Sequence, residues 1–171
     1  MLIRNECGSW IPCAHFLTEL LEAGIITMCL LQIRYWCGGR GGWNLRYFLT
    51  DDSASEQKGF HEAFEDMEPP VQCLLCTVHS QRTLQRNLGS SKKALDHMIT
   101  ALFTRRTEKG CMESIKAAME AANDKDRAYI ERNWKNCTPL WARYVRDSVP
   151  LLAQVCNFSI FHELFSFLLF D

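Results

Sequence analysis

The sequence has almost no net charge, and it has no long apolar run that is free of polar residues. Its 171 residues include 19 lysines and arginines and 20 aspartates and glutamates, so the formal net charge is −1. This balance excludes a whole-chain bias toward nucleic acid or membrane surfaces. The composition, 47% hydrophobic and 23% charged, is close to the globular average and excludes wholesale disorder and fibrous repeats. A chain of this length can bury a sizeable core.

The segment from Leu151 to Phe170 is strongly apolar but is interrupted by polar residues. The run that follows Glu163, Leu164 to Phe170, is far shorter than the roughly 20 residues that a membrane-spanning helix needs. Met1 to Cys13 contains no basic flank followed by an apolar block, which is the pattern of a signal peptide. We therefore expect neither a membrane span nor secretion.

The nine cysteines are odd in number and irregularly spaced. A secreted disulfide framework pairs an even number of cysteines, usually in a shorter chain. Free thiols in a reducing compartment fit this pattern better, so we expect a nuclear or cytoplasmic protein.

The first part of the chain alternates strand-like and helix-like segments. A helix is expected from Thr18, as its N-cap, to Trp36, and the pair Ser53 and Glu56 has the spacing of a capping box at the start of a second helix. The first helix has an apolar stripe formed by Leu20, Leu21, Ile25, Met28, Leu31 and Tyr35. The segments that favour strands are Trp10–Phe16, Asn44–Thr50 and Val71–Leu75. This order predicts an α/β layer with some parallel pairing.

After this region the pattern becomes helical. Apolar residues recur at helical spacing from Leu84 onward, Gly89 ends the first helix, and a short helix is expected after Pro139. Residues 80–146 hold fourteen lysines and arginines against seven acidic residues. We divide the chain into an α/β part at residues 1–79, a basic helical part at residues 80–155 and an apolar tail at residues 156–171.

Asp51 and Asp52 follow directly after an expected strand. Carboxylates at the carboxyl ends of strands point into the crevice where α/β folds bind ligands. Adjacent residues on an extended strand point to opposite faces, so only one of the two can face such a crevice. The alternative is that these aspartates form a turn and cap the next helix.

Cys73, Cys76 and His79 have a spacing that resembles a zinc site. Thiolates and imidazole suit Zn²⁺, but a closed structural site needs four ligands, and no second compact Cys/His pair follows in the sequence. The alternative is that the cysteines pack as small apolar residues and that the histidine forms a hydrogen bond at a strand–helix junction.

The basic helical part could present a surface that contacts phosphates. Phosphate contacts release counterions, so binding of this kind depends strongly on salt. The candidate cations are Arg82, Arg86, Lys92, Lys93, Arg105, Arg106, Lys109, Arg127, Arg132, Lys135, Arg143 and Arg146. Tyr129, Trp134, Trp141 and Tyr144 are interleaved with them. The alternative is a set of solvated helix faces over amphipathic cores.

Several of these features occur in an order that resembles the central part of MULE-type (Mutator-like) transposases, especially relatives of the zinc-finger SWIM kind. The order is a strand pair, a strand that ends in Thr50-Asp51, a helix that carries Ala63-Phe64, the element Cys76-x2-His79, and then Asn87-Leu88. The resemblance extends from about Asn5 to Val155. It implies a partial ribonuclease-H-like sheet followed by an α-helical insertion.

The resemblance also implies an activity and a set of site residues. Enzymes of this family cleave and transfer DNA strands with three acidic residues that hold two Mg²⁺ ions, and Asp51 matches the second acid. Cys76 and His79 match the family's C-x2-H element. The insertion would contact DNA through Arg82, Arg86, Lys92, Lys93, Arg105 and Arg106.

The chain also departs from the family pattern. The family's first acid belongs to a strand that would precede this sequence, and the segment around Glu163 does not match the motif of the third acid. One carboxylate cannot hold two Mg²⁺ ions. We therefore expect a truncated fragment that does not cleave DNA by itself, with exposed strand edges that favour self-association. The alternative is a non-catalytic DNA-binding or protein-interaction module.

Overall fold

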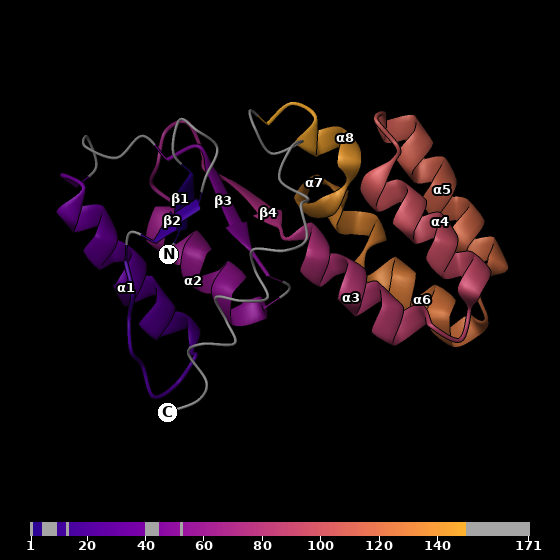
Figure 1. The fold of residues 1–171 in the computed structure, drawn as a ribbon, viewed down its shortest axis with the longest axis horizontal. Coiled ribbons are helices and arrows are strands. Elements are labelled where there is room, and N and C mark those ends of the chain that lie inside the picture. The colour runs from indigo at the N-terminus through magenta and orange to yellow at the C-terminus, as the bar shows by residue number, and fades with distance from the viewer. Residues whose placement is uncertain (1, 5–9, 13, 40–44, 52, 150–171) are drawn as a thin grey trace. The chain divides into compact units, whose positions relative to one another are not determined.

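The computed structural model describes residues 2–4, 10–12, 14–39, 45–51 and 53–149. The chain divides into two compact units, Met1–Leu75 and Cys76–Asp171, which we call the α/β unit and the helical unit (Figure 1). The division falls after Leu75, whereas the sequence places it after residue 79. The expected apolar tail lies outside the described residues.

The described part of the α/β unit alternates short strands with two helices. In chain order its elements are β1 (Leu2–Arg4), β2 (Trp10–Pro12), α1 (Ala23–Trp36), β3 (Tyr47–Thr50), α2 (Ala54–Phe64) and β4 (Gln72–Leu75). Strands β1 and β2 pair antiparallel, and β3 and β4 pair parallel, with Thr50 opposite Leu75. The expected α/β class with parallel pairing is therefore confirmed. The described strands form two two-stranded sheets, which does not define a ribonuclease-H-like sheet.

Helix α1 buries a different face from the one that the sequence predicts. Met28, Leu31 and Tyr35 of the expected stripe are exposed, whereas Leu30 and Ile33 are buried. The helix also begins at Ala23 instead of after Thr18. Apolar residues lie on more than one face of this helix, so their periodicity alone does not identify the core face. The contact with α2 decides it.

Helices α1 and α2 approach each other closely at Gly59. A Cβ atom at this position would lie 2.8 Å from the carbonyl oxygen of Ala23 and 2.9 Å from the Cβ of Ile26. The absence of a side chain therefore lets the two backbones meet. The core of the unit around this contact consists of Leu30, Ile33, Phe60, Ala63 and Phe64.

The expected end of helix α1 at Trp36 is confirmed, and the turn that follows has a specific geometry. Gly38 and Gly39 both have positive φ, 91° and 70°. The Gly38 N–H donates to the Tyr35 carbonyl at 3.1 Å, and the Gly39 N–H donates to the Arg34 carbonyl at 3.0 Å. These two bonds form a Schellman motif, which satisfies carbonyls at the helix end.

The described part of the helical unit contains no strand. Its elements are α3 (Thr77–Leu88), α4 (Lys92–Phe103), α5 (Glu108–Ala121), α6 (Asp124–Asn133), the 3₁₀ turn η1 (Lys135–Cys137), α7 (Thr138–Trp141) and α8 (Arg143–Arg146). The helices expected on either side of Gly89 are confirmed as α3 and α4. One short helix is expected after Pro139, but the structure has two, because Ala142 is extended (ψ 148°) and separates α7 from α8.

Side-chain caps begin two of these helices. The Thr107 hydroxyl accepts from the Gly110 N–H at 3.1 Å at the start of α5. The side-chain Oδ1 atom of Asn123 accepts from the Asp126 N–H at 2.9 Å at the start of α6. Helix α4 packs against α3 and α5. The buried core residues include Leu84, Leu88, Met98, Leu102, Ile115, Ile130, Trp134 and Trp141. No described helix has both the length and the apolar character that crossing a bilayer requires.

Candidate functional site

Asp51 lies at the carboxyl end of β3, in the position that the sequence predicts. The chain leaves the strand at Thr50, and α2 begins three residues after Asp51 at Ala54. Asp51 is half-buried, and its Oδ1 atom is buried without a hydrogen-bond partner in the described part of the chain. Asp52 lies outside the described residues.

Glu56 turns back from the first turn of α2 toward the end of β3. Its Oε2 atom accepts hydrogen bonds from the Thr50 hydroxyl and, at 3.4 Å, from the Asp51 N–H. The Ser53 hydroxyl accepts from the Glu56 N–H at 3.4 Å and caps the helix. The forward bond of the expected capping box is therefore present, and the cap is Ser53 rather than the aspartates. The sequence predicts Glu56 as part of the capping box with Ser53, but it does not predict the contact of the Glu56 carboxylate with the end of β3.

The described residues do not fit a two-metal site. They bring no group of three His, Cys, Asp or Glu side chains together around a position that could hold a metal ion. The Glu56 carboxylate, which contacts the backbone of Asp51, already accepts two hydrogen bonds. Glu163 lies outside the described residues. We therefore derive no step that involves Mg²⁺.

The residues of the expected zinc-like element belong to different structural elements. Cys73 lies in β4, Cys76 is the N-cap residue of α3, and His79 lies in the first turn of α3. Burial and, to a smaller extent, the negative charge of Glu56 together raise the pKa of the Cys73 thiol to about 11. Cys73 is therefore protonated at neutral pH in the metal-free chain. The His79 Nδ1 atom is buried and has no hydrogen-bond partner among the described residues.

The expected DNA-contacting residues Arg82 and Arg86 meet at one place on α3. With His79 and Gln85 they line a cleft of about 520 Å³. Both arginines are exposed, and they lie four residues apart, so they share one side of the helix. The Arg86 guanidinium also donates to the Thr83 hydroxyl at 3.3 Å, which orients it. Gln85 was not a candidate from the sequence, since a lone glutamine carries no distinctive signal.

The other four expected DNA-contacting residues are exposed at the two ends of α4. Lys92 and Lys93 form its first turn, and Arg105 and Arg106 follow its last turn. Arg105 Nε donates to the Ser114 hydroxyl at 2.9 Å, and Arg106 lies 3.6 Å from a carboxylate oxygen of Asp147. All six expected cations are therefore at the surface of the helical unit.

Part of the wider basic and aromatic set is not at the surface. Trp134 and Trp141 are buried and pack edge to face, with ring centroids 5.4 Å apart. Arg146 is buried and donates to the Trp141 carbonyl at 3.2 Å, and Arg143 is paired with Asp147 at 2.8 Å. The interpretation of these residues as a nucleic-acid surface is wrong, because they stabilise the packing of α7 and α8.

Comparisons with family models, with curated proteins and with solved structures find no match to this chain.

Proposed function

We propose that the protein derives from a MULE-type DDE transposase and that its helical unit contacts DNA. One observation carries the proposal. A strand pair, a strand that ends at Thr50-Asp51, helix α2, and then Cys76 and His79 at the start of a helical unit occur in this order along the chain. The family resemblance implies the same order.

The cleft on α3 supports DNA contact. Two exposed guanidinium groups on one side of a helix can each donate two hydrogen bonds to a phosphate. Lys92, Lys93, Arg105 and Arg106 add exposed positive charge to the same unit. Contacts to phosphates carry no sequence information, so we expect binding that is salt-dependent and largely independent of sequence.

The end of β3 supports an inactive catalytic centre. Asp51 would correspond to one family acid. The neighbouring carboxylate of Glu56 already accepts hydrogen bonds from the Thr50 hydroxyl and from the Asp51 N–H. A pair of divalent ions needs several carboxylates to offset their mutual repulsion. We therefore propose that this chain binds DNA without cleaving it.

Fluorescence anisotropy with a labelled duplex tests DNA contact. We expect binding at low salt, and we expect Arg82→Ala combined with Arg86→Ala to lower the slope of log K against log salt by about 2. A matched control, Lys58→Ala combined with Lys125→Ala, removes the same charge from exposed positions and should leave the slope nearly unchanged. No binding at low salt, or equal effects of the two variants, would contradict the proposal.

A cleavage assay tests the catalytic part separately. The full chain, incubated with duplex DNA and Mg²⁺ or Mn²⁺, should give no cleavage product. A metal-dependent product that disappears in Asp51→Ala would show that the centre is active.

An exposed apolar face favours a second role in protein interaction. Met28, Leu31, Tyr35 and Trp36 of α1 are exposed, with 65%, 44%, 75% and 63% of their surface accessible. Contiguous apolar surface of this kind marks interaction sites or promotes self-association. Sedimentation of the full chain should show concentration-dependent association that Leu31→Lys combined with Tyr35→Lys reduces.

A further inference from the structure

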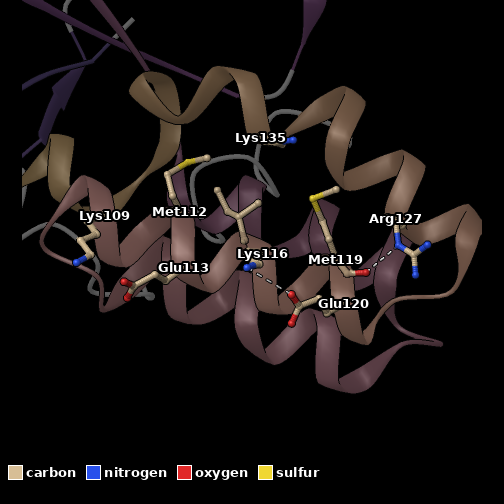
Figure 2. Close-up of a pocket in the computed structure, with 9 residues that line it drawn as sticks. Lys109, Met112, Glu113, Lys116, Met119, Glu120, Arg127 and Lys135 are labelled. Atoms are coloured by element: carbon tan, nitrogen blue, oxygen red, sulfur yellow. Dashed lines mark hydrogen bonds and ion pairs between the residues drawn. The ribbon is translucent and has the colours of Figure 1, made fainter.

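A groove of about 840 Å³ runs along α5 in the helical unit (Figure 2). Its apolar lining consists of Met112, Ile115 and Met119, which are spaced three and four residues apart and therefore share one face of the helix. In Figure 2 the side chains of Met112 and Met119 extend from α5 toward the segment that carries Lys135. The charged lining residues are Lys109, Glu113, Lys116, Glu120, Arg127 and Lys135.

The floor of this groove suits an apolar segment. Ile115 belongs to the core, while Met112 is exposed and Met119 is half-buried. Methionine side chains are flexible and polarisable, so they adapt to apolar partners of irregular shape. An apolar floor bordered by charged residues is the usual form of a groove that receives an amphipathic segment.

The charges at the border do not suit a strongly anionic ligand. Lys116 lies 3.9 Å from Glu120, Arg127 lies 3.1 Å from Asp124, and Lys135 lies 2.9 Å from Glu131. Lys109 and Glu113, the other two charged lining residues, have opposite signs, so the border is electrically balanced. Apolar contact, and not charge, must therefore supply most of the binding energy, which separates this groove from the arginine cleft on α3.

The chain leaves the described residues beside one end of the groove. Helix α8 contacts α4 and α5. Asp147, directly after α8, is paired with Arg106, which lies two residues before the start of α5. Lys109, in the first turn of α5, lines the groove. The last described residues therefore lie near the end of α5 where the groove begins.

The composition of residues 150–171 complements the groove. This segment carries two carboxylates, Glu163 and Asp171, and no lysine or arginine. Phe158, Phe161 and Phe165 follow at intervals of three and four residues, which is the spacing of one helix face. The segment contains more residues than the 14 of α5, so even a helical conformation at about 1.5 Å per residue is long enough to follow the groove.

We propose that residues 151–171 dock in the α5 groove of their own chain, with Phe158, Phe161 and Phe165 over Met112 and Met119. The docked segment covers the exposed methionines and removes its own phenylalanines from water. The balanced charges at the border neither attract nor repel the few charges of this segment strongly, so apolar contact holds it. The apolar tail is then a structural part of the helical unit.

Methionine oxidation in the full chain tests this proposal with internal standards. Oxidation by peroxide follows exposure of the thioether. At concentrations where the chain is monomeric, Met28, which is 65% exposed, should react fast, and Met98, which is fully buried, should react slowly. We expect Met112 and Met119 to react about tenfold more slowly than Met28. Replacing Phe158, Phe161 and Phe165 with serine should accelerate the oxidation of both Met112 and Met119 and leave Met28 and Met98 unchanged.

Two controls keep the test decisive. Gln154→Ser combined with Asn157→Ser changes the same segment without removing an aromatic ring and should preserve the protection. If the serine variant of the phenylalanines is poorly folded, Met119→Glu provides the converse test, because it should accelerate chymotryptic cleavage after Phe158, Phe161 and Phe165.

Rates for Met112 and Met119 that equal the rate for Met28 in the unchanged chain would overturn the proposal. So would protection that survives the phenylalanine changes, or protection that is lost on dilution, which would mean that a second copy covers the groove.

Discussion

Arg34 and Asp66 form a two-pronged ion pair that joins α1 to the chain just after α2. Arg34 Nη1 lies 2.6 Å from Asp66 Oδ1, and Nη2 lies 3.2 Å from Oδ2. Nη1 also donates to the Ala63 carbonyl at 3.0 Å. The arginine side chain is 7% exposed and the aspartate side chain 32%. The pair therefore holds a buried charge at the helix contact that forms the core of the α/β unit.

Asp66→Ala should destabilise the α/β unit strongly. It leaves the buried Arg34 guanidinium without its carboxylate, and we expect a loss of about 2–3 kcal/mol, less than for a fully buried pair because Asp66 is partly exposed. The matched control is Lys58→Ala, which breaks the exposed pair between Lys58 and Glu62, keeps the hydrogen bond from the Thr27 hydroxyl to Glu62, and should cost about 0.5 kcal/mol or less. Hydrogen exchange of the α1 amides in the full chain measures both. Equal protection in the two variants would contradict this assignment.

Asp126→Ala should be far more harmful than Asp124→Ala. Both residues lie in the first turn of α6, so both interact equally with the helix dipole. Asp126 is buried and accepts hydrogen bonds from the Ser91 hydroxyl and from Asn123 Nδ2 at 3.0 Å, whereas the Asp124 side chain is 99% exposed. We expect a cost of about 1–3 kcal/mol for Asp126→Ala and a few tenths for Asp124→Ala. The melting temperature of the full chain, followed by circular dichroism, would show whether the two differ.

Trp141→Phe should cost more than Trp134→Phe. The two rings pack against each other, and either change replaces an indole of this pair with a smaller ring. Trp141 Nε1 donates to the Trp134 carbonyl at 3.0 Å, while Trp134 Nε1 is buried with no hydrogen-bond partner in the part of the chain that the structure describes. The difference should be about 1 kcal/mol, the net value of one hydrogen bond. Urea unfolding of the two variants checks the order, and the reverse order would mean that Trp134 Nε1 has a partner.

Cys73 and Cys111 should react slowly with iodoacetamide below about pH 10, while the exposed Cys37 reacts fast. Burial first, and then the neighbouring charge of Glu56 for Cys73 and of Glu108 for Cys111, raise the pKa of both thiols from 9.0 to about 11. Glu56→Gln should therefore lower the pKa of Cys73 alone, and Glu108→Gln that of Cys111 alone. Mass spectrometry of the alkylated peptides at several pH values measures each pKa, and each variant is the control for the other.

The same thiols make stability depend on pH in a defined direction. Because their pKa values are higher in the folded state, the folded chain binds more protons than the unfolded chain between pH 9 and pH 11. Their contribution to stability is fully present below pH 9 and is lost as the pH rises through 11. The melting temperature should fall over this interval, and Cys111→Ala should reduce the fall.

The local sequence predicts the boundaries of several helices of this protein well, but it predicts less well which helix faces are buried. Ser53 marks the start of α2 because its side chain caps a neighbouring backbone N–H, and Gly89 with the serines after it coincides with the boundary between α3 and α4. The prediction that the stripe through Met28 and Leu31 is buried is wrong, because helix α1 carries apolar residues on several sides. The prediction that the tryptophans near α7 contact nucleic acid is wrong for a related reason. Tryptophan occurs both in protein cores and at sites where bases stack, so its position in the sequence does not distinguish the two.

The sequence by itself determined the α/β start, the helical continuation and the position of Asp51 after a strand, because these depend on residues that are close along the chain. Only the tertiary structure decided which face of α1 is buried, that Glu56 reaches the end of β3, that Arg82 and Arg86 share a cleft, and that Met112 and Met119 form a groove. These features depend on which elements meet and how closely. At Gly59 the missing side chain sets that distance, and no local pattern shows what lies opposite it.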